Sequence, residues 1–142
     1  MGNRLKSILD LAEATENNAI RDFVEARRDW QSNQSKLLEL RVFRDDYQQV
    51  QLTRAEPQSA GRFRSARTFL LQLSQAIDQQ EAQVAELLNV MKSKEESWLA
   101  TKVKRKSIVR LIEKRDDLVR YEKNRQEQKE LDEISQRNNH LY

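Results

Sequence analysis

The sequence Pro-Gln-Ser-Ala-Gly at residues 57–61 decides the fold, because it is the one strong helix-breaking cluster in a chain of 142 residues. Proline lacks the amide hydrogen that a helix interior needs, and glycine lowers helix propensity. The stretches on both sides are rich in Glu, Gln, Lys, Arg, Leu and Ala, which favour helices. We therefore predict a helix over about residues 5–54, a turn over about 55–61 and a second helix over about 62–137.

The composition supports an all-α fold and one domain. The chain holds only two Gly and one Pro, whereas a sheet domain of this length needs many turns built on such residues. Charged residues make up 35% of the chain, above the usual level of about 25%. The formal net charge of +3 is too small to demand a nucleic acid as partner. There is no run of about 18 apolar residues, so no membrane-spanning helix is predicted.

An alternating step of four and three residues selects an apolar stripe in both predicted helices. Ten of fourteen positions from Leu5 to Gln51 are apolar, and so are eleven of sixteen from Ala66 to Val119. A seven-residue repeat of this length is typical of a coiled-coil seam. Because the turn is short, we predict an antiparallel coiled-coil hairpin whose second helix is longer and overhangs the first. A turn centred near residue 58 sets Leu37 level with Gln79.

Six of the nine polar residues in this stripe are charged or are asparagine, and such interruptions lower stability but fix the register of a coiled coil. They are Glu16, Asn33, Arg44, Lys94, Arg105 and Arg115. We expect a marginally stable hairpin in which replacing Asn33 by Leu raises the melting temperature.

The sequence does not indicate an enzyme. Cys is absent, which excludes thiol catalysis and zinc sites built on cysteine, and there is no Gly-rich phosphate loop. The single His, His140, lies near the end of the sequence, where a frayed position is the simplest interpretation. The many carboxylates lie beside Lys and Arg at helical spacing, as on a solvated helix face. We predict no catalytic residue, no cofactor and no metal site.

Charge is concentrated in the second half of the second helix. Residues 102–125 hold ten Lys and Arg against four acidic residues, and acidic residues dominate 127–133. This pattern fits either a solvated helix face or a docking surface for an acidic protein. Nucleic acid is not favoured, because stacking on bases needs interleaved aromatic residues that the run lacks.

The predicted hairpin tip carries more apolar side chains than a two-helix seam covers. Phe43, Phe63 and Phe69 flank the seam there, close to the seam residues Leu40, Tyr47 and Leu73. Large exposed apolar patches usually mark partner sites. Both a protein-binding patch and ordinary packing remain open for these side chains.

Several short segments, taken in order and spacing, resemble the flagellar export protein family FliJ over nearly the whole chain. They are LDLAE at 9–13, YQQ at 47–49, Phe69 and Leu73 with Ala76-Ile77 and Gln79-Gln80, Ser97-Trp98 before the basic run, and Gln128-Lys129 with Asp132-Glu133 and Gln136-Arg137. The resemblance implies a cytoplasmic coiled coil, similar to the stalk subunit of rotary ATPases, within the flagellar type III export apparatus. The sequence departs from the family pattern at Phe43, where a Tyr is common, and in the turn.

The resemblance also implies partners: the hexameric export ATPase, the cytoplasmic domain of the export gate, and export chaperones. Association with the membrane would be peripheral, through the export apparatus. Carried over by aligned position, the gate-binding candidates are Leu40, Phe43, Tyr47, Phe69, Leu73, Ala76 and Gln80. The candidates for contact with the ATPase ring are Lys102, Lys104, Arg105, Lys106, Arg110, Lys129, Asp132, Glu133, Gln136 and Arg137. An injectisome stalk protein and a generic coiled-coil scaffold are the alternatives.

Overall fold

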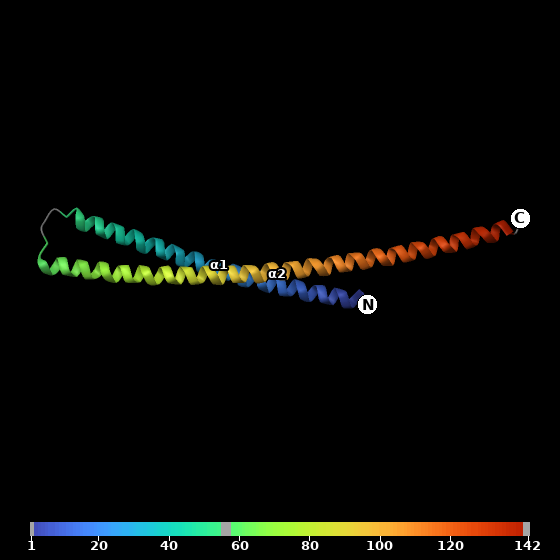
Figure 1. Ribbon diagram of the computed structural model, residues 1–142, viewed down its shortest axis with the longest axis horizontal. Coiled ribbons are helices and arrows are strands. Elements are labelled where there is room, and N and C mark those ends of the chain that lie inside the picture. The colour runs from blue at the N-terminus through green and yellow to red at the C-terminus, as the bar shows by residue number, and fades with distance from the viewer. Residues whose placement is uncertain (1, 55–57, 141–142) are drawn as a thin grey trace. The chain divides into compact units, whose positions relative to one another are not determined.

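The chain forms two long helices that pack against each other, as predicted. The computed structural model describes residues 2–54 and 58–140, in which α1 spans Gly2–Leu52 and α2 spans Ala60–His140 (Figure 1). Both helices extend slightly beyond the predicted starts, and α1 ends two residues before the predicted residue 54. The all-α class and the longer second helix are confirmed. That the chain folds as one domain stays a prediction.

Hydrogen bonds of Ser59 define the start of α2. The Ser59 hydroxyl oxygen accepts a hydrogen bond from the Arg62 amide at 3.2 Å, and the Ser59 carbonyl accepts one from the Phe63 amide at 3.0 Å. Ser59 is therefore the N-cap of α2, which satisfies one of the free amides of the first turn. Residues 55–57, including Pro57, lie outside the described residues. Gly61, predicted to lie in the turn, lies inside α2 instead, because the cap at Ser59 starts the helix earlier.

Gly61 offers a direct test of this helix start. A Cβ atom added at Gly61 would meet nothing within 4 Å, and its φ is not positive. Gly61→Ala should therefore raise the free energy of unfolding by about 0.5–1 kcal/mol, because alanine loses less backbone entropy in a helix. Ser59→Ala, which removes the cap, should lower it by about 1 kcal/mol. Urea denaturation followed by circular dichroism measures both, and a destabilising Gly61→Ala would contradict the helix start.

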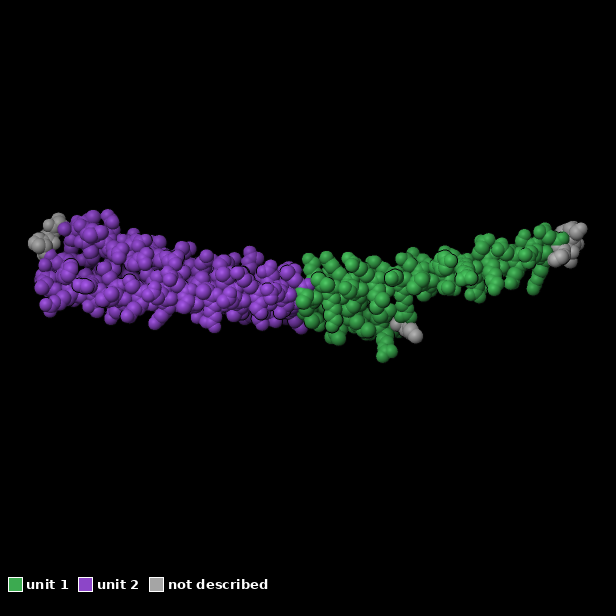
Figure 2. Space-filling view, viewed as in Figure 1, with its two compact units in different colours: residues 1–16, 100–142 green, residues 17–99 purple. Residues whose placement is uncertain are grey.

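The chain divides into two compact units, and each contains one segment of each helix. Unit 1 comprises residues 1–16 and 100–142, and unit 2 comprises residues 17–99 (Figure 2). The largest apolar core lies in unit 2, where Leu37, Leu73 and Ile77 are buried together and Leu40 and Val84 pack against them. Leu37 thus lies beside Ile77, close to the level that the sequence predicts.

The predicted seam agrees with the burial of individual side chains. All fourteen predicted positions of α1 are buried or half-buried, and so are fourteen of the sixteen in α2. The exceptions are Lys94, whose neighbour Glu95 is half-buried instead, and Val119. Val119 is exposed because it lies beyond the paired part of unit 1: every side chain from residue 116 to 139 is exposed. This stretch of α2 is the predicted overhang.

Polar residues of the seam meet one another across the two helices. In unit 1, Arg105 Nε donates a hydrogen bond to Glu16 Oε2, and this carboxylate is buried. In unit 2, Gln80 Nε2 donates to the Asn33 backbone carbonyl at 2.8 Å and to Asn33 Oδ1 at 3.1 Å. A buried polar group costs little when it is paired, so these two layers are tolerated inside a narrow core.

The two layers should respond in opposite directions to an apolar substitution. Asn33→Leu should raise the free energy of unfolding by about 1 kcal/mol, because it buries a larger apolar side chain. The Gln80 amide keeps the backbone carbonyl of residue 33 as its acceptor. Arg105→Leu should instead lower stability by about 1–2 kcal/mol, because the Glu16 carboxylate loses its cation in a partly buried site. Thermal denaturation measures the change in stability of both variants, and shifts of the same sign would refute this prediction.

Candidate protein-binding surfaces

Three aromatic rings from the two helices of unit 2 form a cluster near the hairpin end. The Phe43 and Phe69 ring centroids are 6.1 Å apart with planes at 72°, and those of Tyr47 and Phe69 are 4.8 Å apart with planes at 54°. We name Phe43, Tyr47 and Phe69 the tip cluster. Phe43 is 53% exposed and Phe69 37% exposed, so the rings contact one another and still offer apolar surface to water. The packing and binding interpretations of these residues are therefore compatible.

The other predicted gate-binding residues lie deeper. Leu73 is part of the buried core, and Leu40 packs against that core. Ala76 is half-buried, and the side-chain amide of Gln80 is hydrogen-bonded to Asn33. The structure thus leaves Phe43 and Phe69 exposed, whereas Leu73 is buried in the core of unit 2.

The outer face of α1 carries further exposed apolar residues that the sequence reasoning missed. Leu38 and Val42 are exposed and line a shallow apolar depression together with Phe43. Two carboxylates, Glu39 and Asp46, border the depression. A spacing of four residues between apolar positions outside the seam, at 38 and 42, is the signal that points to this surface.

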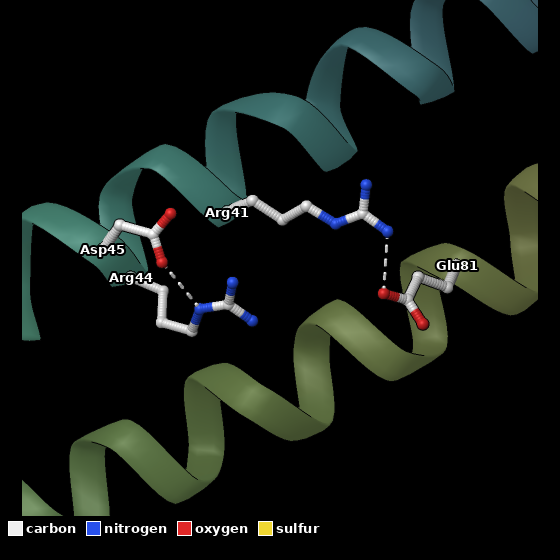
Figure 3. A network of polar contacts seen from close by, with 4 residues as sticks. All are labelled: Arg41, Arg44, Asp45 and Glu81. Atoms are coloured by element: carbon white, nitrogen blue, oxygen red, sulfur yellow. Dashed lines mark hydrogen bonds and ion pairs between the residues drawn. The ribbon is translucent and has the colours of Figure 1, made fainter.

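Ion pairs lie beside this surface. Arg41 Nη2 of α1 and Glu81 Oε1 of α2 are 2.9 Å apart, and Arg44 Nε and Asp45 Oδ1 are 3.2 Å apart (Figure 3). The four side chains are between 31% and 65% exposed to water, so each pair contributes at most about 1 kcal/mol. The first pair bridges the helices, whereas the second joins neighbours on α1.

A second depression lies beside the tip cluster and reaches the turn. Its apolar wall includes Tyr47, Ala66 and Phe69, and its polar wall includes Arg54 and Arg62. The aromatic surface is therefore continuous with a basic surface at the end of the hairpin.

The predicted ATPase-contacting residues fall into two groups within unit 1. In the first group, Lys104, Lys106 and Arg110 are exposed, Lys102 is half-buried, and the Arg105 guanidinium is engaged by Glu16.

The second group lies on the overhang, where all five predicted residues are exposed. They are Lys129, Asp132, Glu133, Gln136 and Arg137. Gln128 Nε2 donates a hydrogen bond to Asp132 Oδ1 at 3.3 Å. Beyond Val119 the heptad step continues through Glu122, Gln126, Lys129 and Glu133, so the seam face of the overhang is polar. A polar seam face does not need a second helix to cover it.

Side chains that could bind a metal ion are not grouped together in the part of the chain that the structure describes. No group of three or more His, Asp or Glu side chains placed to hold a metal ion occurs among these residues. The side chain of His140 is not among those described. Within the same ranges, neither helix contains a stretch apolar enough to cross a membrane.

These observations define an all-helical protein of the two-helix coiled-coil class, with an exposed aromatic cluster and charged helix faces. The family model described as "Flagellar FliJ protein" matches residues 1–140. The chain therefore belongs to the FliJ family, and membership implies a structural component of the flagellar protein export apparatus. Comparisons with the curated proteins and with the solved structures found no match.

Proposed function

We propose that this protein is a cytoplasmic, non-enzymatic stalk that links the export ATPase ring to the cytoplasmic domain of the flagellar export gate. It also assists in handling export chaperones. The observation that carries the proposal is the exposed tip cluster in unit 2. The family match favours the flagellar system over an injectisome and over a generic scaffold.

The tip cluster supports the gate-binding part of the proposal. Aromatic side chains dominate the energetics of protein interfaces, and Phe43 and Phe69 remain 53% and 37% exposed to water. Phe69 contacts both other rings, so it holds the cluster together. Leu73 lies in the core of unit 2, and Leu40 packs against that core. The proposed gate-binding site is therefore centred on the tip cluster.

The overhang supports the ATPase-binding part of the proposal. Residues 116–139 form a single helix with every side chain exposed, and its seam face is polar. A lone helix of this length extends about 36 Å, which is enough to enter a protein ring. The mixed charges at Lys129, Asp132, Glu133 and Arg137 suit a bore lined by charged side chains.

Loss of the Phe69 ring tests the gate site. Phe69→Ala should weaken binding to the gate's cytoplasmic domain by about five- to 150-fold, which corresponds to about 1–3 kcal/mol, because it removes the ring that joins the cluster. The double variant with Tyr47→Ala should bind more weakly still. Calorimetric titration measures the affinity, and circular dichroism measures the helix content.

Phe63→Ala is the matched control, because Phe63 is an exposed aromatic residue near the start of α2 that lies outside the tip cluster. It should bind like the unmodified protein. Unchanged affinity of Phe69→Ala with unchanged helicity would refute the tip cluster as the gate site. A collapse of helicity would show that the ring acts in folding.

Truncation of the overhang tests the ATPase contact. Deleting residues 116–142 removes only exposed side chains among those described, so the paired helices should stay folded. This truncation should abolish stimulation of the export ATPase and leave gate binding intact. Deleting only residues 138–142 keeps all predicted contact residues and should preserve stimulation. Equal stimulation by both truncated proteins, measured as phosphate release, would count against the proposal.

A further inference from the structure

A small apolar groove lies between the helices of unit 1. Its α1 wall consists of Ile8, Leu11, Ala12 and Thr15. Its α2 wall consists of Thr101, Lys104 and Ile108. Leu11 is 69% exposed and Ile8 45% exposed, so the groove opens to water with apolar edges. Neither residue is needed to fill the seam, because Leu9, Ala12 and Ile108 already do so.

The rows beside the seam explain why the groove is apolar. In a two-helix coiled coil, the positions that flank the seam are usually charged. Here Ile8 and Thr15 are one heptad apart in the flanking row of α1, and Leu11 lies just outside it. In α2 the row of Lys104 continues one heptad at a time through Leu111 and Leu118, which are both exposed. A stripe widened in this way is typical of helices that contact two neighbours rather than one.

The charges around the groove have one sign. The heptad rows that border the groove carry the basic residues Arg4, Lys104 and Lys114. Within residues 3–15 and 100–121, no Asp or Glu occupies these rows. The nearby acidic residues Asp10 and Glu13 belong to heptad positions on the other flank of α1. Glu16 lies in the seam and is paired with Arg105. An occupant of the groove therefore meets cations on both of its sides.

We propose that this groove binds a third helix, an amphipathic helix from a partner protein whose apolar stripe is flanked by Asp and Glu. The apolar stripe would pack on Ile8, Leu11 and Ile108, and the flanking carboxylates would face Arg4, Lys104 and Lys114. The α2 row from Lys104 to Leu118 offers about 20 Å, or four helical turns. A second copy of this chain fits less well, because a symmetric contact would bring the same cations face to face. This inference goes beyond the proposed stalk function and does not rest on it.

Two synthetic peptides of about 20 residues test the groove, since a helix of that length spans it. Both have Leu at the seam positions of a heptad repeat; one has Glu at the flanking positions and its twin has Lys. Fluorescence anisotropy with the full chain should show the Glu peptide binding at least about tenfold more tightly than the Lys peptide at low salt. Leu11→Glu and Lys104→Glu should each weaken binding of the Glu peptide about tenfold.

Val103→Glu is the matched control, because Val103 is 64% exposed in the same unit but is not a lining residue of the groove. It should leave binding unchanged, and circular dichroism should show equal helicity for all variants. Equal affinity for the two peptides, or an equal loss with Val103→Glu, would overturn the proposal. So would a dimer in sedimentation that Leu11→Glu dissolves, since the occupant would then be a second copy. The test uses no export protein, so its failure leaves the proposed function standing.

Discussion

The structure depends on one constraint: each helix has only the other helix against which to bury its apolar side chains. In such a pair the seam takes about two positions in seven, and the remaining positions face water. Among the described residues, the buried apolar core consists only of Ala12, Ala26, Leu37, Leu73 and Ile77. The hairpin is therefore stabilised by the length of the seam rather than by the depth of a core. Its 35% of charged residues follow from the large share of positions left in water.

A narrow and regular seam creates a second problem, because helices with a uniform apolar stripe can slide by whole heptads. The two polar layers of the seam oppose this sliding. Glu16 is hydrogen-bonded to Arg105, and Asn33 is hydrogen-bonded to Gln80. A shift of one heptad would separate both pairs. The first separation would leave the buried Glu16 carboxylate without its cation, and the second would leave the half-buried Gln80 amide without its acceptors on Asn33. The same residues that weaken the seam thus specify one alignment of it.

The sequence predicted the buried faces of both helices almost residue by residue, because burial follows directly from the heptad period. It predicted the pairing of the helices less well. A turn centred on residue 58 would set Phe23 opposite residue 93, but the Phe23 ring stacks on Trp98, with ring centroids 5.6 Å apart. Side-chain packing decides such a shift, and the period carries no information about it. The predicted tip residues show the same limit: spacing located Phe43 and Phe69, but only the fold shows that their rings meet while Leu73 is buried in the core.

The positions that flank the seam connect the fold to binding. Charged residues at these positions would keep a two-helix coiled coil soluble and without further partners. This chain instead has Phe69 in one flanking row of α2, and Leu111 and Leu118 occupy the same heptad position further along. Because such residues add little to the seam, they can change without unfolding the hairpin. Partner surfaces on a coiled coil are therefore to be sought first in its flanking rows, because folding alone does not explain an apolar residue there.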